Sequence, residues 1–210
     1  MALFRERAVV LKALSFFSIG CQEGLYWGIV AATMSPSLIA SAFLVHGILS
    51  AWCCVAMNRP NVRRFSAESR AIVLGCVAIA GQVLVLAAFR RLGDDEDTAT
   101  TASPSGALLF LGTLCFGLTD FPAQALLRGA VGEKFEGSPF LEDAMANVIF
   151  SLTAGNIAFF VAGPAVKPSR QAAACAGVGL VSVAGLLATW AENSRTPTAT
   201  RATPDEAAKC

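Results

Sequence analysis

Apolar residues gather in six runs that are separated by short polar segments. Each run has roughly the ~20 residues that an α-helix needs to cross a hydrocarbon core, and a backbone in lipid must satisfy its hydrogen bonds within the segment. The pattern therefore predicts an all-α chain with six transmembrane helices. The predicted spans are Ala13–Met34, Pro36–Met57, Ala71–Phe89, Gly106–Leu127, Ala144–Gly163 and Gln171–Trp190.

The polar segments between the runs have the composition of turns and tails. Ser35-Pro36 separates the first two runs with almost no loop, and residues 91–105 and 129–143 form longer polar connections. The end of the chain is rich in Thr, Ala and Pro, a composition typical of disorder. We therefore expect a cytoplasmic N-terminal segment at 1–12, a six-helix transmembrane domain at 13–190 and a disordered cytoplasmic tail at 191–210.

The distribution of Lys and Arg predicts the direction of insertion. If the N-terminus is cytoplasmic, the inner side carries 11 Lys or Arg residues and the outer side carries four. This excess favours both termini in the cytoplasm. Arg59, Arg63 and Arg64 make one inner loop basic, which serves topology and contact with anionic lipid. The first run continues past Trp27, too long for the apolar part of a signal peptide, so we expect it to be retained.

Composition agrees with a membrane protein and excludes several other classes. The chain is 55% hydrophobic and only 15% charged, with a net charge of +1, whereas soluble domains carry about 25% charged residues. These values argue against a disordered chain, an ordinary soluble domain and a nucleic-acid binder. Six of the seven cysteines lie in apolar runs, and the chain has one histidine, so neither a disulfide framework nor a common zinc site is expected. No catalytic motif is present, so we expect no enzyme and no cofactor.

Three polar residues fall near the middle of the first three spans. They are Glu23, His46 and Gln82. A charged side chain at a helix centre costs about 2.5–3.5 kcal/mol on insertion scales, so each needs a partner or a function. Their similar depth predicts that Glu23 pairs with His46 or Gln82. Two interpretations remain open: a ligand or proton site at mid-membrane, or interhelical hydrogen bonds worth roughly 0.6–2 kcal/mol each.

The fourth span carries a polar stripe. Thr113, Gly117, Asp120 and Gln124 are spaced i, i+4, i+7 and i+11, which places them on one helical face. Such a stripe must face protein or a water-filled cavity rather than lipid. It ends near Arg128, which is within reach of Asp120 or Gln124. Structural packing and a functional site are both compatible with this pattern.

Small residues on two other spans predict close contacts between helices. Glycine at every fourth position allows another backbone to approach closely. These faces are Gly20, Gly24 and Gly28 on the first span, and Asn147, Ser151, Ala154 and Ala158 on the fifth, with Gly155 and Asn156 beside them. The spacing does not identify the partner of either face.

The fourth span contains Gly117-Leu118-Thr119-Asp120-Phe121-Pro122-Ala123-Gln124. This stretch resembles a helix signature of the uncoordinated-type (Unc-ninety-three-like) proteins, which have a major facilitator fold. In that signature G-x-x-D is followed by Gln/Asn-Thr-Gln; here Gln124 matches the first polar position, and Ala125 and Leu126 replace the other two. Further similarity lies in Phe16-Phe17-Ser18, Glu23-Gly24, Phe135, Ala146-Asn147, Ala154-Gly155 and Ile157-Ala158-Phe159.

The resemblance covers Ala13 to Trp190 and implies one six-helix half of a major facilitator fold. It also implies a role as a regulator of ion channels or a trafficking chaperone for membrane receptors. The alternatives are half of a transporter, based on Glu23, His46 and Asp120, and a structural subunit of a larger membrane complex. The expected partners are membrane lipids and another polytopic membrane protein or a second copy, bound through the first, second, fourth and fifth helices.

Overall fold

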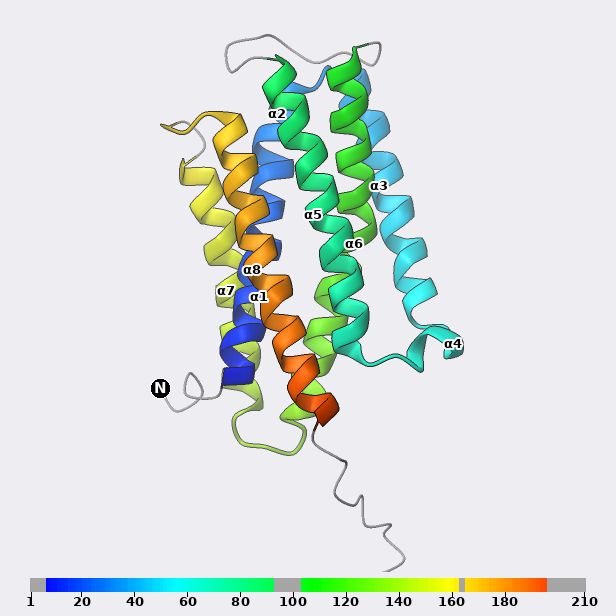
Figure 1. Cartoon of the computed structure of the whole chain (residues 1–210), viewed down its shortest axis with the longest axis vertical. Helices are drawn as coiled ribbons and strands as arrows, with labels where there is room; N and C mark the ends of the chain where they lie inside the picture. Colours follow the sequence, from blue (N-terminus) through cyan, green and yellow to red (C-terminus); the bar gives the residue numbers. More distant parts are fainter. Residues whose placement is uncertain (1–6, 93–102, 163–164, 196–210) are drawn as a thin grey trace, which may run out of the picture.

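The computed structural model describes residues 7–92, 103–162 and 165–195, which fold as helices with no strand among them (Figure 1). The elements in chain order are α1 (Arg7–Glu23), the π-helix η2 (Gly24–Val30), α2 (Ala31–Thr33), α3 (Pro36–Met57), α4 (Pro60–Arg63), α5 (Ala67–Leu92), α6 (Pro104–Lys134), α7 (Leu141–Ala162) and α8 (Pro168–Arg195). The all-α fold that the sequence predicts is confirmed for these residues.

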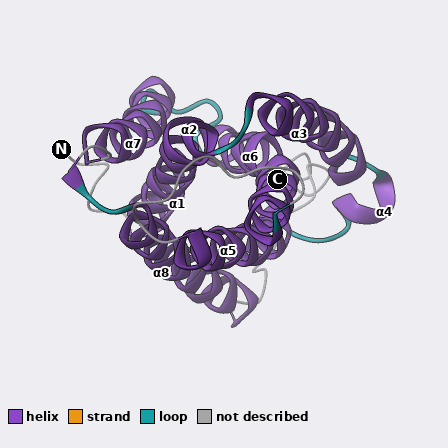
Figure 2. Ribbon diagram, turned by 90° about the horizontal axis from the view of Figure 1, so that it is seen from above, coloured by secondary structure: helices purple, strands orange, loops and turns teal. Residues whose placement is uncertain are grey.

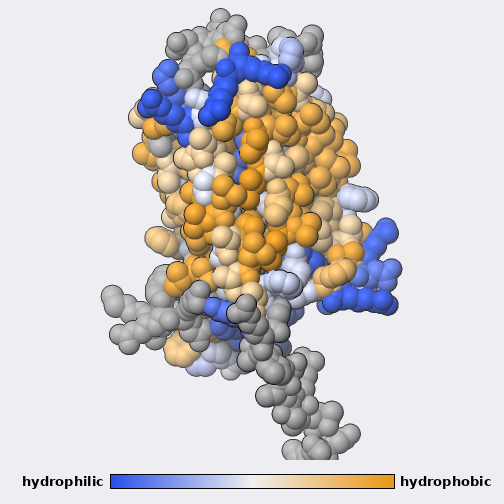
Figure 3. All heavy atoms as spheres, viewed as in Figure 1, coloured by the Kyte–Doolittle hydropathy of each residue, from blue (hydrophilic) through white to orange (hydrophobic). Residues whose placement is uncertain are grey.

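Five of these helices are long and apolar enough to cross a membrane: α3, α5, α6, α7 and α8. Figure 3 shows apolar residues around the middle of the bundle and hydrophilic residues toward its two ends. This distribution is the one that a hydrocarbon slab with polar borders selects. The helices are those of an integral, multi-pass membrane protein.

The first predicted span differs from an ordinary α-helix. Residues 7–33 form one continuous helical stretch, in which α1 ends at Glu23, the wider η2 follows directly, and the short α2 comes last. The backbone N–H of Ala31 donates to the carbonyl oxygen of Tyr26, an i→i+5 bond. Such wider turns occur often at functional sites. The predicted helix over Ala13–Met34 is thus confirmed over most of its length, with a π-helical segment that the sequence did not predict.

Several helices extend beyond the apolar runs. α1 begins at Arg7, α6 continues through Gly129 and Gly132 to Lys134, and α8 ends at Arg195. The predicted boundaries at 13, 127 and 190 were too narrow because hydropathy ends where charges begin, whereas helical hydrogen bonding continues outside the membrane core. The break at Ser35-Pro36 is confirmed: Ser35 is extended, and proline opens α3. The remaining tail, 196–210, the connection at 93–102 and Gly163-Pro164 lie outside the described residues.

The helices pack as a bundle with two unequal sides. α5 packs on α6 and α8, α1 packs on α7 and α8, and α3 packs mainly on α6. Seen from above, α5 and α8 lie on one side, while α7 and α3 stand at the two ends of the other side (Figure 2). We call that second side, bounded by α3 and α7, the α3–α7 face. α2 and α6 lie between its two boundaries.

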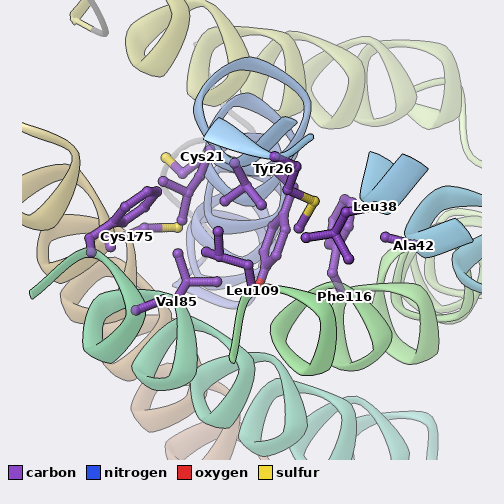
Figure 4. Packing of buried hydrophobic residues seen from close by; sticks show 14 residues of the cluster. Cys21, Tyr26, Leu38, Ala42, Val85, Leu109, Phe116 and Cys175 are labelled. Carbon is purple, nitrogen blue, oxygen red and sulfur yellow. The ribbon is translucent and has the colours of Figure 1, made fainter. Parts of the chain in front are cut away.

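An aromatic and aliphatic core joins η2 to its neighbours (Figure 4). The ring of Tyr26 stacks on that of Phe116 from α6, with centroids 4.4 Å apart and planes 2° from parallel. Leu25, Val85 and Leu109 are fully buried around them. Each such side chain contributes about 1.5–3 kcal/mol where it leaves water, and in a membrane its close packing selects one arrangement of the helices. The core thus fixes η2 against α6.

The bundle places the start of α1, α4 and the end of α8 at one end (Figure 1). In a cysteine-free background, Asn61→Cys in α4 and Ala165→Cys before α8 should react with a membrane-impermeant thiol reagent from opposite sides. The positive-inside rule puts Asn61 in the cytoplasm, because Arg59, Arg63 and Arg64 surround it. Labelling of both positions from one side would contradict this topology.

Candidate functional site

A hydrogen-bonded cluster links α1, α6 and α7 within the helical bundle. The side-chain amide of Gln124 donates from Nε2 to Glu23 Oε1 at 2.8 Å and to Asp120 Oδ1 at 2.8 Å. Its other end, Oε1, accepts from Arg128 Nη2 at 2.9 Å. Asn156 Nδ2 donates to Glu23 Oε2 at 3.2 Å. We call these five residues, together with His46, the polar network: Glu23, His46, Asp120, Gln124, Arg128 and Asn156.

α6 supplies three members of the polar network from one face. Asp120, Gln124 and Arg128 follow at intervals of four residues, so their side chains lie one above the other. Thr113 and Gly117 continue the stripe and are buried with Asp120 and Gln124. The sequence prediction that this stripe faces protein is confirmed, as is the approach of Arg128 to Gln124.

His46 reaches the network because α3 approaches α6 very closely at Gly117. A Cβ on residue 117 would lie 2.8 Å from His46 Cα and 2.9 Å from its carbonyl oxygen, so only glycine fits. The imidazole Nε2 then lies 3.8 Å from Asp120 Oδ2, and both side chains are almost fully buried. Neither ring nitrogen of His46 has a hydrogen-bond partner among the described residues.

Three aromatic rings surround the imidazole. Phe116 meets it edge-on at 4.8 Å, and Trp27 and Phe43 lie 5.7 Å and 6.0 Å away, centroid to centroid. Trp27 and Phe43 stack on each other at 4.2 Å. Trp27 belongs to η2, the π-helix that begins immediately after Glu23. Trp27 follows Glu23 by four residues, so the ring beside the histidine and the carboxylate that accepts from Gln124 come from neighbouring turns.

The polar network is buried at one end and open at the other. Asp120 and His46 are each 2% exposed and Gln124 is 6% exposed, whereas Glu23, Arg128 and Asn156 remain partly exposed. Glu23 lies between α6 and α7, so the open end belongs to the α3–α7 face. Charged groups at membrane depth need protein or water against them.

The predicted pairing of Glu23 with His46 or Gln82 was wrong. Glu23 bonds to Gln124 and Asn156 instead, and His46 approaches Asp120. Gln82 is fully buried on α5, and neither end of its amide has a partner among the described residues. Equal depth in consecutive helices is no evidence of contact: α1 packs on α7 and α8, whereas α3 and α5 pack on α6.

The glycine face of the first span contacts α7 of the same chain. A Cβ on Gly20 would collide with the Leu152 carbonyl oxygen, and one on Gly24 would lie 2.7 Å from Phe159 Cβ. A Cβ on Gly28 would lie 3.2 Å from Cε1 of the Phe160 ring. The partner that the sequence left open is therefore internal, and bulky changes at these glycines act first on the fold.

The other predicted candidates lie outside the polar network. Ser151 Oγ donates to the Asn147 carbonyl oxygen at 2.7 Å, a bond within α7. Asn147 lines a small hollow beside Lys12 and Phe135. The basic residues flank or belong to α4 at one end of the bundle and are exposed; they are Arg59, Arg63 and Arg64.

Sequence reasoning missed Asn156 as a member of the site. It placed the contact face of α7 on Ala154 and Ala158, but these line an exposed hollow, and the face that meets α1 is Leu152, Gly155, Asn156 and Phe159. The sequence signal that could have identified Asn156 is its position next to Gly155, because a small residue that allows close helix contact is followed there by a polar one. Of the rings around His46, only Phe43, three residues earlier on α3, had a sequence signal, because Trp27 and Phe116 come from other helices.

The site is not arranged as a metal centre. Across residues 7–92, 103–162 and 165–195, no three His, Cys, Asp or Glu side chains come together in a way that holds a metal ion. The side-chain amides of Gln124 and Asn156 instead donate to carboxylates, and the guanidinium of Arg128 donates to the amide oxygen of Gln124. Hydrogen bonds thus hold the charged groups of the polar network within the bundle, and Glu23 and Arg128 stay partly exposed at its open end.

Glu23→Gln should be tolerated better than Glu23→Leu. A glutamine oxygen still accepts from Gln124 or Asn156, whereas leucine removes the acceptor of Asn156 and one of the two acceptors of Gln124, at a cost of about 1–3 kcal/mol. The two variants can be compared by the yield of monodisperse protein in mild detergent and by unfolding in mixed micelles. Equal loss in both would show that the Glu23 hydrogen bonds contribute nothing to stability.

Comparison with known proteins gives no relative: no protein-family model, no curated protein and no solved structure matches this chain.

Proposed function

We propose that the chain is a non-catalytic, six-span membrane protein that regulates or chaperones another membrane protein by binding it across the α3–α7 face. Both ends of the six-span domain are placed in the cytoplasm in this proposal, on the Lys and Arg asymmetry of the sequence. The occupant of the face is a transmembrane protein that offers polar or small side chains at the depth of Glu23.

One observation carries the proposal. Glu23 and Arg128 are partly exposed on the open side of the polar network, within a chain whose helices are apolar enough to span a membrane. Exposure of such charges to lipid costs roughly 2.5–3.5 kcal/mol each on insertion scales. A polar surface on a second protein removes this cost and gives the charges a counterpart. The chain alone leaves that side open.

The flanks of the α3–α7 face suit a partner that lies in the membrane. α3 and α7 bury few of their residues within the bundle. Their exposed large apolar residues include Leu44, Ile48 and Trp52 on α3, and Phe150, Ile157 and Val161 on α7. Such apolar surfaces suit surroundings of lipid and transmembrane helices, among which polar groups act as the specific contacts.

The resemblance to Unc-ninety-three-like proteins adds support from the sequence. Its main segment, Gly117 to Gln124, supplies Asp120 and Gln124 of the polar network. Members of that family regulate potassium channels or chaperone membrane receptors, which matches a role in binding rather than in catalysis. One half of a major facilitator fold also has a side that a second half normally covers.

The test is site-specific photo-crosslinking in native membranes. A photoreactive amino acid replaces Trp27, which is 47% exposed on η2, or Val181, which is 59% exposed on α8 on the opposite side. We expect the probe at 27, and not the probe at 181, to join the chain to one membrane protein in a complex of fixed stoichiometry. Light scattering of that complex in nanodiscs gives its mass.

Two results would overturn the proposal. A monodisperse monomer with no crosslink from position 27 means that lipid or water covers the face. A crosslink between two copies of the chain, with a matching homodimer mass, means that the occupant is a second copy and not a regulated partner.

A second candidate is half of a major-facilitator-type transporter. The observation that favours it is the placement of Glu23, Asp120 and His46 between α1, α3 and α6 at membrane depth, since transport sites of such folds lie near the midplane between halves. Purified protein in liposomes should then take up solute under a pH gradient. Absence of uptake together with a heteromeric crosslink would exclude the transporter and support the regulator proposal.

A further inference from the structure

The polar network contains more negative than positive charge. Glu23 and Asp120 are carboxylates when ionised, and the guanidinium of Arg128 is always charged in proteins. All three bond to one neutral amide, that of Gln124. With both carboxylates ionised and His46 neutral, one negative charge is left without compensation at membrane depth. A single additional positive charge makes the site neutral.

The geometry provides a place for that charge. Glu23 Oε1 and Asp120 Oδ1 each lie 2.8 Å from the same nitrogen, so the two carboxylates are close neighbours. Two ionised carboxylates this close repel each other. On the other side of Asp120, the Nε2 atom of His46 lies 3.8 Å from Oδ2 and has no hydrogen-bond partner among the described residues. His46 is 2% exposed, so a buried polar ring points at the carboxylate pair without a bond of its own.

We propose that Glu23, Asp120 and His46 form a proton-binding site that holds one proton per chain. The proton lies on the carboxylate pair, or on the imidazole next to it, and leaves as the pH rises. The indole of Trp27 lies 5.7 Å from the imidazole, within the distance at which an aromatic face attracts a cation, which favours an imidazolium here. This site belongs to the chain itself and does not depend on a partner at the α3–α7 face.

The groups that face the site come from four elements. α1 contributes Glu23, and α3 contributes His46 and the Cys54 thiol, which interacts with Asp120. α6 contributes Asp120 and Arg128, and α7 contributes the neutral amide of Asn156. α5 packs on the other side of α6, where Gly81 and Val85 contact Gly112. These three residues are not ionisable. Arg128 is thus the fixed cation of the site, and His46 is its titratable base.

The experiment is a pH titration of the full chain in nanodiscs by infrared difference spectroscopy. The protonated carboxyl and the imidazolium have separate bands, which are followed between about pH 4 and pH 10. The wild type should lose one site proton reversibly. Asp120→Asn and Glu23→Gln each remove one negative charge, so the signal assigned to the site should disappear in both. Glu142→Gln, at the exposed start of α7, is the matched control and should keep it.

The proposal is overturned if the wild type and Asp120→Asn show the same pH-dependent carboxyl and imidazole bands. If Asp120→Asn does not fold, Trp27 gives a readout in a folded background. With Trp52 and Trp190 replaced by Phe, the remaining indole lies 5.7 Å from His46 and should be quenched when the imidazole or its neighbour takes up the proton. Emission from Trp27 that stays constant over the same pH range, together with a featureless infrared titration, contradicts the site.

Discussion

Gly20→Leu should lower the free energy of unfolding by about 3 kcal/mol, the upper part of the range for overpacking a tight contact. The reason is that a side chain at residue 20 meets backbone, not flexible side-chain ends: the Leu152 carbonyl oxygen stands directly in its way, and Asn156 N lies 2.9 Å from the Cβ position. α1 and α7 must then separate. Because Asn156 donates to Glu23 across this contact, the separation also weakens the polar network.

Gly47→Leu on α3 is the matched control. Nothing lies within 4 Å of a Cβ at residue 47, so leucine there has room on the exposed surface of the helix. The two variants should be compared by unfolding in mixed detergent micelles, followed by loss of helical signal. Gly155→Leu, whose Cβ would collide with the Phe17 carbonyl oxygen from the other side of the same contact, should behave like Gly20→Leu. Similar stability of Gly20→Leu and Gly47→Leu would contradict the close α1–α7 packing.

The sequence predicted those features that depend on one helix at a time. Hydropathy located the helices, and the break at Ser35-Pro36 followed from the geometry of proline. The spacing of Asp120 and Gln124 placed both on one buried face, which is a property of a single helix. Helical periodicity alone was sufficient for these conclusions.

Features that depend on which helices touch were not predictable from this sequence. Glu23 and His46 have similar depth, yet the structure places Gln124 and Asp120 between them. The close approach at Gly117 sets the position of α3, and nothing in the local pattern says that its neighbour is residue 46. The π-helical turn after Glu23 also had no sequence signal, because hydropathy is the same for both kinds of helix.

The second prediction with a large expected effect compares two buried glutamines. Gln124→Met should lower the free energy of unfolding by about 3 kcal/mol, because one amide serves Glu23, Asp120 and Arg128, and its loss removes the hydrogen bond of the buried Asp120 and one partner each of Glu23 and Arg128. Gln82→Met should leave stability unchanged or raise it. Neither end of the Gln82 amide has a partner among the described residues, and an apolar side chain of similar length removes an unsatisfied polar group.

The contrast separates hydrogen bonding from burial, since both glutamines are buried and both become methionine. The same unfolding assay measures the two single variants and the double variant. The effects should add, because Gln82 shares no hydrogen bond with the polar network. A loss at Gln82 as large as the loss at Gln124 would mean that a bound water satisfies the Gln82 amide, and that membrane depth, not the network, sets the contribution of each glutamine. A loss confined to Gln124 assigns the stability of this region to the single amide that holds two carboxylates and an arginine together.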